Sequence, residues 1–150
     1  MKNPKKDGHK KDFMESWNAI EAFYSSFSGN WISMGKDALR LIQQMRDLGL
    51  DEKLRAGQSL TTFFLSRNRN HGLDKEPHIQ ISFLGNNKMN VVSSFNGAGL
   101  FNEQHIGKEC EVHYSGYLPE MIHKLLEQEI IRNEYEDDNL NAFFAAIDTD

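Results

Sequence analysis

Apolar and polar residues alternate with a period of two through residues 78 to 95, HIQISFLGNNKMNVVSSF. Such a period places Ile79, Ile81 and Phe83 on one face of an extended strand, and the same alternation resumes at Met89 and Val91 in a second strand. The residues between the two runs, GNNK, include Gly and Asn, which tolerate positive φ and suit a reversing loop. The stretch therefore predicts an antiparallel hairpin at the centre of the fold.

Two helical patterns precede this hairpin. Aromatic and aliphatic residues recur every three or four positions between Phe13 and Phe27, which predicts a helix with one aromatic face in the core. Asp12 is positioned to cap that helix. A second amphipathic pattern follows Ser33, a predicted cap, and ends before Gly49, a residue type that is typical of helix C-termini. The two segments are expected to form a helical hairpin.

Further strands and helices follow along the chain. Residues 51–56 are expected to form one more helical turn, whereas residues 60–65, LTTFFL, have the β-branched and aromatic content of a strand. Alternation returns in residues 109–114, ECEVHY, and apolar periodicity after Pro119 and in residues 140–147 indicates one or two helices. This order predicts an α+β fold in which an antiparallel sheet of three to four strands is flanked by an N-terminal helical hairpin and one or two C-terminal helices.

The chain of 150 residues is long enough for a single domain with one core. Residues 1–11, with five Lys, one Asp and no apolar anchor, are expected to be a disordered basic arm, and residues 12–150 a single α+β domain with an acidic C-terminal segment. No apolar run approaches the roughly 18 residues of a membrane span. The single Cys and the lack of a secretion signal predict a cytoplasmic protein.

Charge is distributed unevenly along this chain. The formal net charge is −5, but residues 101–150 hold three basic and twelve acidic side chains. A surface of that kind repels nucleic acid and favours a basic protein partner. A solvated acidic tail is the alternative interpretation of the densest run, residues 134–138. The predicted partner-binding residues are Glu134, Tyr135, Glu136, Asp137 and Asp138, with Glu109 and Glu111 on the neighbouring strand.

A second candidate site lies between the strand at 60–65 and the central hairpin. Arg67, Arg69 and His71 would project to one side of an extended loop, and two guanidinium groups with an imidazole suit a phosphate or a carboxylate. A hydrophilic connecting loop is the simpler interpretation of the same residues. If the cluster is functional, it predicts a small-molecule or nucleotide-binding domain with an anion site at residues 67–71.

The sequence contains none of the common local motifs of catalytic or metal-binding sites. Cys110 and His113 are three residues apart on a predicted strand, so they point to opposite faces and form no local nucleophile and base. The six His include no HExxH pair, and the chain has no GxSxG, Walker or GxGxxG motif. These patterns predict a protein that is not an enzyme and has no cofactor or metal.

The leading hypothesis is a non-enzymatic protein-binding module, most specifically a cytoplasmic bacterial immunity protein that neutralises a basic toxin such as a nuclease. The alternative is the small-molecule or nucleotide-binding domain described above. No membrane partner is expected, nucleic acid is disfavoured by the acidic C-terminal third, and self-association into a homo-oligomer is left open.

Overall fold

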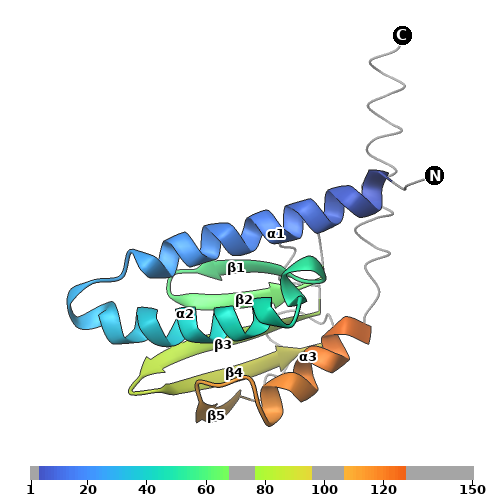
Figure 1. The fold of residues 1–150 in the computed structure, drawn as a ribbon. Coiled ribbons are helices and arrows are strands. Elements are labelled where there is room, and N and C mark those ends of the chain that lie inside the picture. Colours follow the sequence, from blue (N-terminus) through green and yellow to red (C-terminus); the bar gives the residue numbers. More distant parts are fainter. Residues whose placement is uncertain (1–3, 68–76, 96–106, 128–150) are drawn as a thin grey trace.

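The computed structural model describes residues 4–67, 77–95 and 107–127, with side chains from residue 10 onward. In these ranges three α-helices accompany five strands, which form one antiparallel sheet in the order β1-β2-β3-β4-β5 (Figure 1). The α+β prediction is confirmed, with one strand more than expected. The elements are α1 (Pro4–Ser25), η1 (Gly29–Trp31), α2 (Ile32–Asp47), η2 (Leu50–Glu52), β1 (Arg55–Ser59), β2 (Thr62–Ser66), β3 (His78–Gly85), β4 (Lys88–Ser94), β5 (Gly107–Glu111) and α3 (Tyr117–Glu127).

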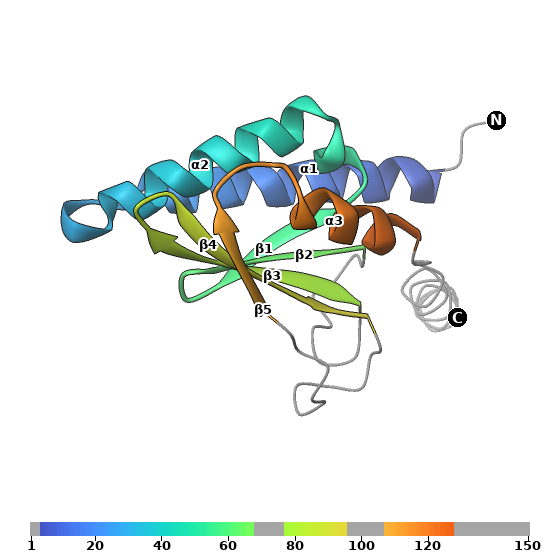
Figure 2. The ribbon, with the colours of Figure 1, turned by 90° about the horizontal axis from the view of Figure 1, so that it is seen from below.

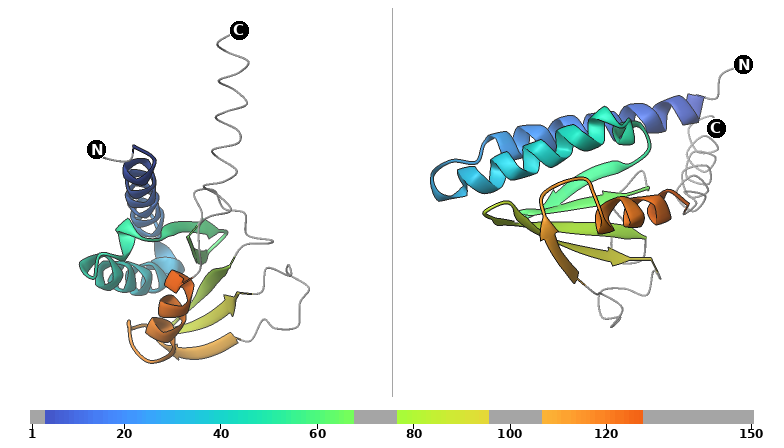
Figure 3. Two further views of the ribbon diagram at one scale, coloured as in Figure 1. Left: turned by 90° about the vertical axis from the view of Figure 1, so that its right-hand side faces the viewer. Right: turned by 60° about the horizontal axis from the view of Figure 1, so that its bottom comes forward.

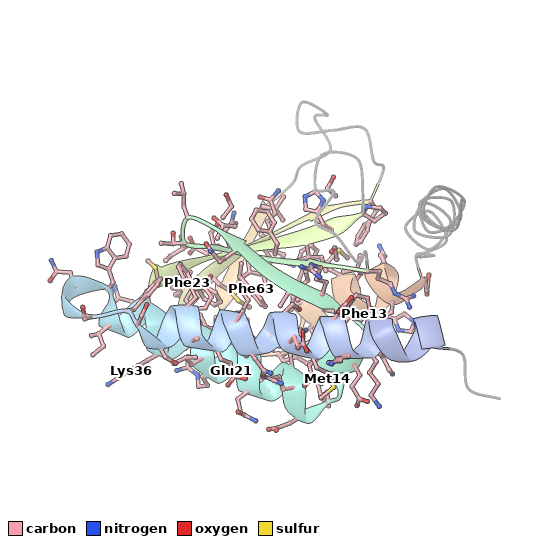
Figure 4. The ribbon with its side chains drawn as sticks, turned by 90° about the horizontal axis from the view of Figure 1, so that it is seen from above. Phe13, Met14, Glu21, Phe23, Lys36 and Phe63 are labelled. Atoms are coloured by element: carbon pink, nitrogen blue, oxygen red, sulfur yellow. The ribbon has the colours of Figure 1, made fainter. Side chains whose placement is uncertain are left out.

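All three described helices lie on one face of the sheet (Figure 2), and the core fills the space between them and the strands. Aromatic rings make the central contacts: the ring of Trp17 on α1 meets that of Phe63 edge to face at 5.8 Å, and Tyr24 meets Phe83 at 5.6 Å. In Figure 4, Phe63 lies close to α1, whereas Lys36 points outward from α2. The buried side chains include Trp17, Ile20, Tyr24, Leu41, Ile42, Met45, Phe63, Leu65, Ile79, Ile81, Met89, Val91, Leu118, Ile122 and Leu125.

The central hairpin is formed by β3 and β4, as its alternation predicts. Ile81 pairs with Val91 and Phe83 with Met89, and all four side chains are buried on the helix side of the sheet. The turn between the strands uses positive φ at three successive residues, 85 to 87, which Gly and Asn tolerate better than other residues.

The first helix is longer than expected. It begins at Pro4 and not after Asp12, so residues 4 to 11, which were expected to belong to a disordered arm, form its first turns. Lys is a good helix former, and Lys10 extends to Glu52 with a 2.6 Å ion pair that links this end of α1 to η2. Sequence patterns find helices by their apolar stripe, and this part of α1 has none.

The first strand, β1, was not predicted. Residues 51–56 were expected to form a helical turn, but the turn is only η2, and the sequence RAGQS pairs with β2 as a strand. Its short polar and glycine-containing sequence has little strand propensity of its own. Contacts with α1 and β2 determine its structure instead, since the Ala56 N–H donates to the hydroxyl of Ser16 at 2.9 Å.

Two other boundaries differ by a few residues. The second helix begins at Ile32, with Trp31 at the N-cap position and no side-chain cap, so the predicted cap at Ser33 is wrong. β5 occupies Gly107–Glu111, and residues 112 to 114 follow it outside the strand. The predicted helix at 140–147 lies outside the described residues. Among the residues that are described, no helix combines the length and apolarity needed to cross a membrane.

Candidate partner-binding surface

Two of the predicted partner-binding residues, Glu109 and Glu111, lie on β5 at the border of the sheet (Figure 3). Cross-strand pairing places Glu109 opposite Asn90 and Glu111 opposite Lys88, on the face that carries none of the described helices. We call this the outer face. Both Glu residues are exposed, and within the described ranges neither carboxylate makes a hydrogen bond or an ion pair. Their negative charge is therefore available to a partner.

The other two side chains of β5, those of Lys108 and Cys110, lie on the helix side of the sheet. Cys110 is half-buried against the core, and Lys108 lies over the ring of Tyr117 with its ammonium 5.3 Å from the ring centre. Burial raises the pKa of the Cys110 thiol. Lys108 partly opposes this effect by lowering the pKa, whereas Glu109 adds to it. A thiol of this kind is not activated as a nucleophile.

A polar cluster on α2 holds the turn that precedes β4 and so positions β5. The buried carboxylate of Asp37 accepts the Asn87 N–H at 3.1 Å and an Arg40 guanidinium N–H at 3.3 Å. Arg40 also donates to the side-chain oxygen of Asn87 and to the carbonyl of Val112 at 3.4 Å. We call Asp37, Arg40 and Asn87 the turn clamp. Since Val112 directly follows β5, the clamp ties both the turn and the end of β5 to the helix layer.

A hollow with a mixed polar and apolar lining adjoins the same turn and was not predicted. It has a volume of about 430 Å³, and two large apolar side chains at its border are unusually accessible, Trp31 at 54% and Leu84 at 49%. The Trp31 ring is supported from within by Phe27, whose ring centre is 6.5 Å away. The one sequence signal was a Trp among turn-forming residues, outside any apolar stripe. The hollow is lined by Asn30, Trp31, Ser33, Met34, Leu84, Gly85 and Asn86.

The β3–β4 turn connects the hollow with the acidic strand. Gly85 and Asn86 line the hollow, and Lys88, directly after the turn, pairs with Glu111 on β5. Apolar and acidic groups therefore border one another at this end of the sheet. Aromatic side chains beside a hollow are typical anchors in protein interfaces, while charges around them set association rate and specificity.

The predicted anion site is represented in the described residues by Arg67 alone. Its guanidinium donates to the carbonyl of Leu126 near the C-terminal end of α3, so the side chain links β2 to that helix. This contact occupies one of the guanidinium N–H groups that an anion would otherwise bind. Arg69 and His71 lie outside the described residues, as do the predicted partner-binding residues Glu134, Tyr135, Glu136, Asp137 and Asp138.

A row of buried polar residues crosses the outer face and was also missed. His78 is buried between Ser66 on β2 and Ser94 on β4, its two cross-strand neighbours, and a ring nitrogen lies 3.0 Å from the side-chain nitrogen of Gln80. Among the described residues the Ser66 hydroxyl has no hydrogen-bond partner, so it is not paired with His78 as a nucleophile would be with its base. In the described part of the chain, no group of His, Cys, Asp and Glu side chains has the arrangement of a metal site.

Comparison of the chain with models of known protein families, with curated proteins and with solved structures finds no match. The fold and the surface described above are therefore the basis for inferring function.

Proposed function

We propose that this chain is a non-enzymatic protein-binding module that holds a positively charged protein against the outer face of β5. The observation that carries the proposal is the pair Glu109 and Glu111, both exposed and without a partner in the described ranges, on a strand at the border of the sheet. Carboxylates placed in this way attract a cationic surface and speed its association.

The specific form of the proposal is a cytoplasmic inhibitor, of the immunity-protein kind, that neutralises a basic toxin such as a nuclease. Carboxylates that meet a cationic active site occupy the place of the phosphates that a nuclease binds. The formal net charge of −5 supports this direction of attraction. The hollow beside Trp31 adds the apolar contact that charged surfaces need for a slow dissociation rate.

The test is purification of partners from the source cell with the tagged full chain as bait, at low and then at moderate salt. The decisive variant is the charge reversal Glu109→Lys with Glu111→Lys. Its matched control is Glu15→Lys with Asp47→Lys, which makes the same change in net charge at exposed positions of α1 and α2, away from β5.

We expect a basic protein that the unmodified chain and the control retain at low salt, that the β5 variant loses, and that rising salt releases. Isothermal titration with the purified partner then gives the loss in affinity, which we expect to be at least about tenfold. Equal retention by the two variants would show that β5 does not bind the partner and would refute the proposal.

A further inference from the structure

The two borders of the sheet differ in how their main-chain groups are satisfied. Along β1, α1 supplies hydrogen-bond partners: the Ala56 N–H donates to the Ser16 hydroxyl at 2.9 Å, and the Trp17 indole N–H donates to the carbonyl of Leu54, just before the strand, at 2.8 Å. Figure 1 shows α1 alongside β1, and shows β5 at the opposite border. Within the described ranges β5 pairs with β4 alone. An uncovered border strand is a template for pairing with another chain.

The hydrogen-bond pattern identifies which groups of β5 are available. The Val112 N–H donates to the Asn87 carbonyl at 3.1 Å, and in an antiparallel ladder such bonded pairs recur at every second residue. Cys110 and Lys108 therefore direct their N–H and C=O groups to β4. The corresponding groups of Gly107, Glu109 and Glu111 point away from β4, and all three residues are exposed.

A second copy of β5 is a poor occupant of this border because of its charges. Opposite residues in an antiparallel pair share a face, so a two-fold pairing of β5 with itself can be centred on residue 108, 109 or 110. These registers place Lys108 opposite Lys108, Glu109 opposite Glu109, or Glu109 opposite Glu111. Like charges directly opposite one another destabilise a strand pair.

A foreign strand with the complementary pattern fits the same border. Its residues opposite Glu109 and Glu111 would lie on the outer face, where basic side chains match the two carboxylates at a Cβ separation of about 5 Å. The residue between them would lie on the helix side beside half-buried Cys110, where an apolar side chain suits the edge of the core.

We propose that β5 binds an extended antiparallel segment of its protein partner that has a basic, an apolar and a basic residue in succession. The inference rests on the proposed function, a module that binds a basic protein, and adds the mode of binding. Recognition then combines main-chain bonds at Gly107, Glu109 and Glu111, which provide affinity, with side-chain charge at the two Glu residues, which provides specificity.

The probe is a blocked nine-residue peptide in which Lys and Val alternate, compared with a peptide of the same composition whose Lys residues are grouped at one end. Binding to the full chain is followed by NMR, together with amide hydrogen exchange. The alternating peptide is expected to slow exchange at Gly107, Glu109 and Glu111 by about tenfold or more, with little change at Lys108 and Cys110, because those amides already bond to β4. The grouped peptide should bind more weakly by a similar factor.

A matched pair of variants separates the main-chain contribution from charge. Glu109→Gln removes the carboxylate and keeps the N–H, whereas Glu109→Pro removes both. Because this N–H points away from β4, the proline leaves the β4–β5 ladder intact, and thermal unfolding monitored by circular dichroism verifies that the variant is folded. The proline variant should lose a further severalfold in affinity for the alternating peptide beyond the glutamine variant.

The outcomes distinguish this inference from the proposed function. If the two peptides bind equally and without protection of the three amides, or if the Gln and Pro variants bind alike, strand addition is wrong, although the charge-dependent capture of a partner stands. If neither peptide binds while capture still depends on Glu109 and Glu111, strand addition is again wrong and the proposed function survives. If capture does not depend on those residues, both fail.

Discussion

The turn clamp makes a prediction about stability that can be derived from its contacts. Replacing Asp37 with Ala removes the acceptor of the Asn87 N–H and the partner of Arg40 in one step. Asp37 is only 6% exposed, so its carboxylate is held between the helix layer and the turn, and Ala cannot replace these two contacts. We expect Asp37→Ala to destabilise the fold, and to loosen the β3–β4 turn and β5 more than the rest of the sheet.

The magnitude follows from the exposure of each partner. A hydrogen bond to a charged group contributes about 1.5 to 3 kcal/mol, and the lower figure applies because Asn87 is exposed and its amide regains water. The Arg40 side chain is 46% exposed, which limits that ion pair to about 0.5 to 1 kcal/mol. The better helix propensity of Ala returns about 0.5 kcal/mol. The expected loss is about 2 kcal/mol, or roughly 4 to 8 °C in Tm for a domain of this size.

Urea unfolding followed by far-ultraviolet circular dichroism measures this loss, with Lys36→Ala as the control because Lys36 is the exposed neighbour on α2. The control should change stability by less than about 0.5 kcal/mol. Amide exchange adds a local test, since the Val112 N–H bonds to Asn87 and should exchange faster relative to the amide of Ile81 in the sheet centre. A loss in Asp37→Ala no larger than in the control would refute the idea that the clamp holds the turn.

Three further predictions concern packing, recognition and thiol chemistry. Gly35→Ala should cost about 1 to 3 kcal/mol in urea unfolding, because the added Cβ would lie 2.7 Å from the carbonyl oxygen of Tyr24; unchanged stability would contradict that packing. Trp31→Ala should weaken binding of the captured partner at least about tenfold with little change in Tm, since the side chain is already largely exposed; a large fall in Tm would mean a role in the core instead. Iodoacetamide should alkylate Cys110 more slowly at pH 8 in the folded chain than in urea, because the raised pKa leaves less thiolate. The difference between the two alkylation rates should narrow as the pH rises through the pKa of the folded thiol. Equal rates at pH 8 would refute this prediction.

The parts of the fold that sequence alone predicts are those in which a residue's own preference and its tertiary surroundings agree. In the β3–β4 hairpin, alternation, β-branched content and a Gly-Asn turn all favour the same structure, and the observed register pairs Ile81 with Val91. In β1 they do not agree. The sequence RAGQS favours no strand, and it becomes one because β2 pairs with it and Ser16 on α1 binds its Ala56 N–H.

The same distinction applies to the candidate sites. Glu109 and Glu111 were identified because alternation within a strand assigns a face to each residue, and the structure places both on the exposed outer face. Trp31 was missed because its exposure depends on where α1 ends and how α2 meets the β3–β4 turn. Arg67 was assigned to an anion site because its chemistry suits one, whereas its contact with Leu126, 59 residues later in the chain, has no signature in the local sequence.

Strand geometry also changes what the net charge of β5 means. Lys108, Glu109 and Glu111 sum to a single negative charge along the sequence, but the alternation of faces separates them. Lys108 is turned to the helix side and held over Tyr117, so the outer face of β5 presents two carboxylates, with only Lys88 opposite one of them. A partner that lies on the outer face therefore meets Glu109 without a neighbouring cation on β4, since its cross-strand neighbour is the neutral Asn90. For that reason Glu109, more than Glu111, is expected to determine which basic residue of the partner is selected.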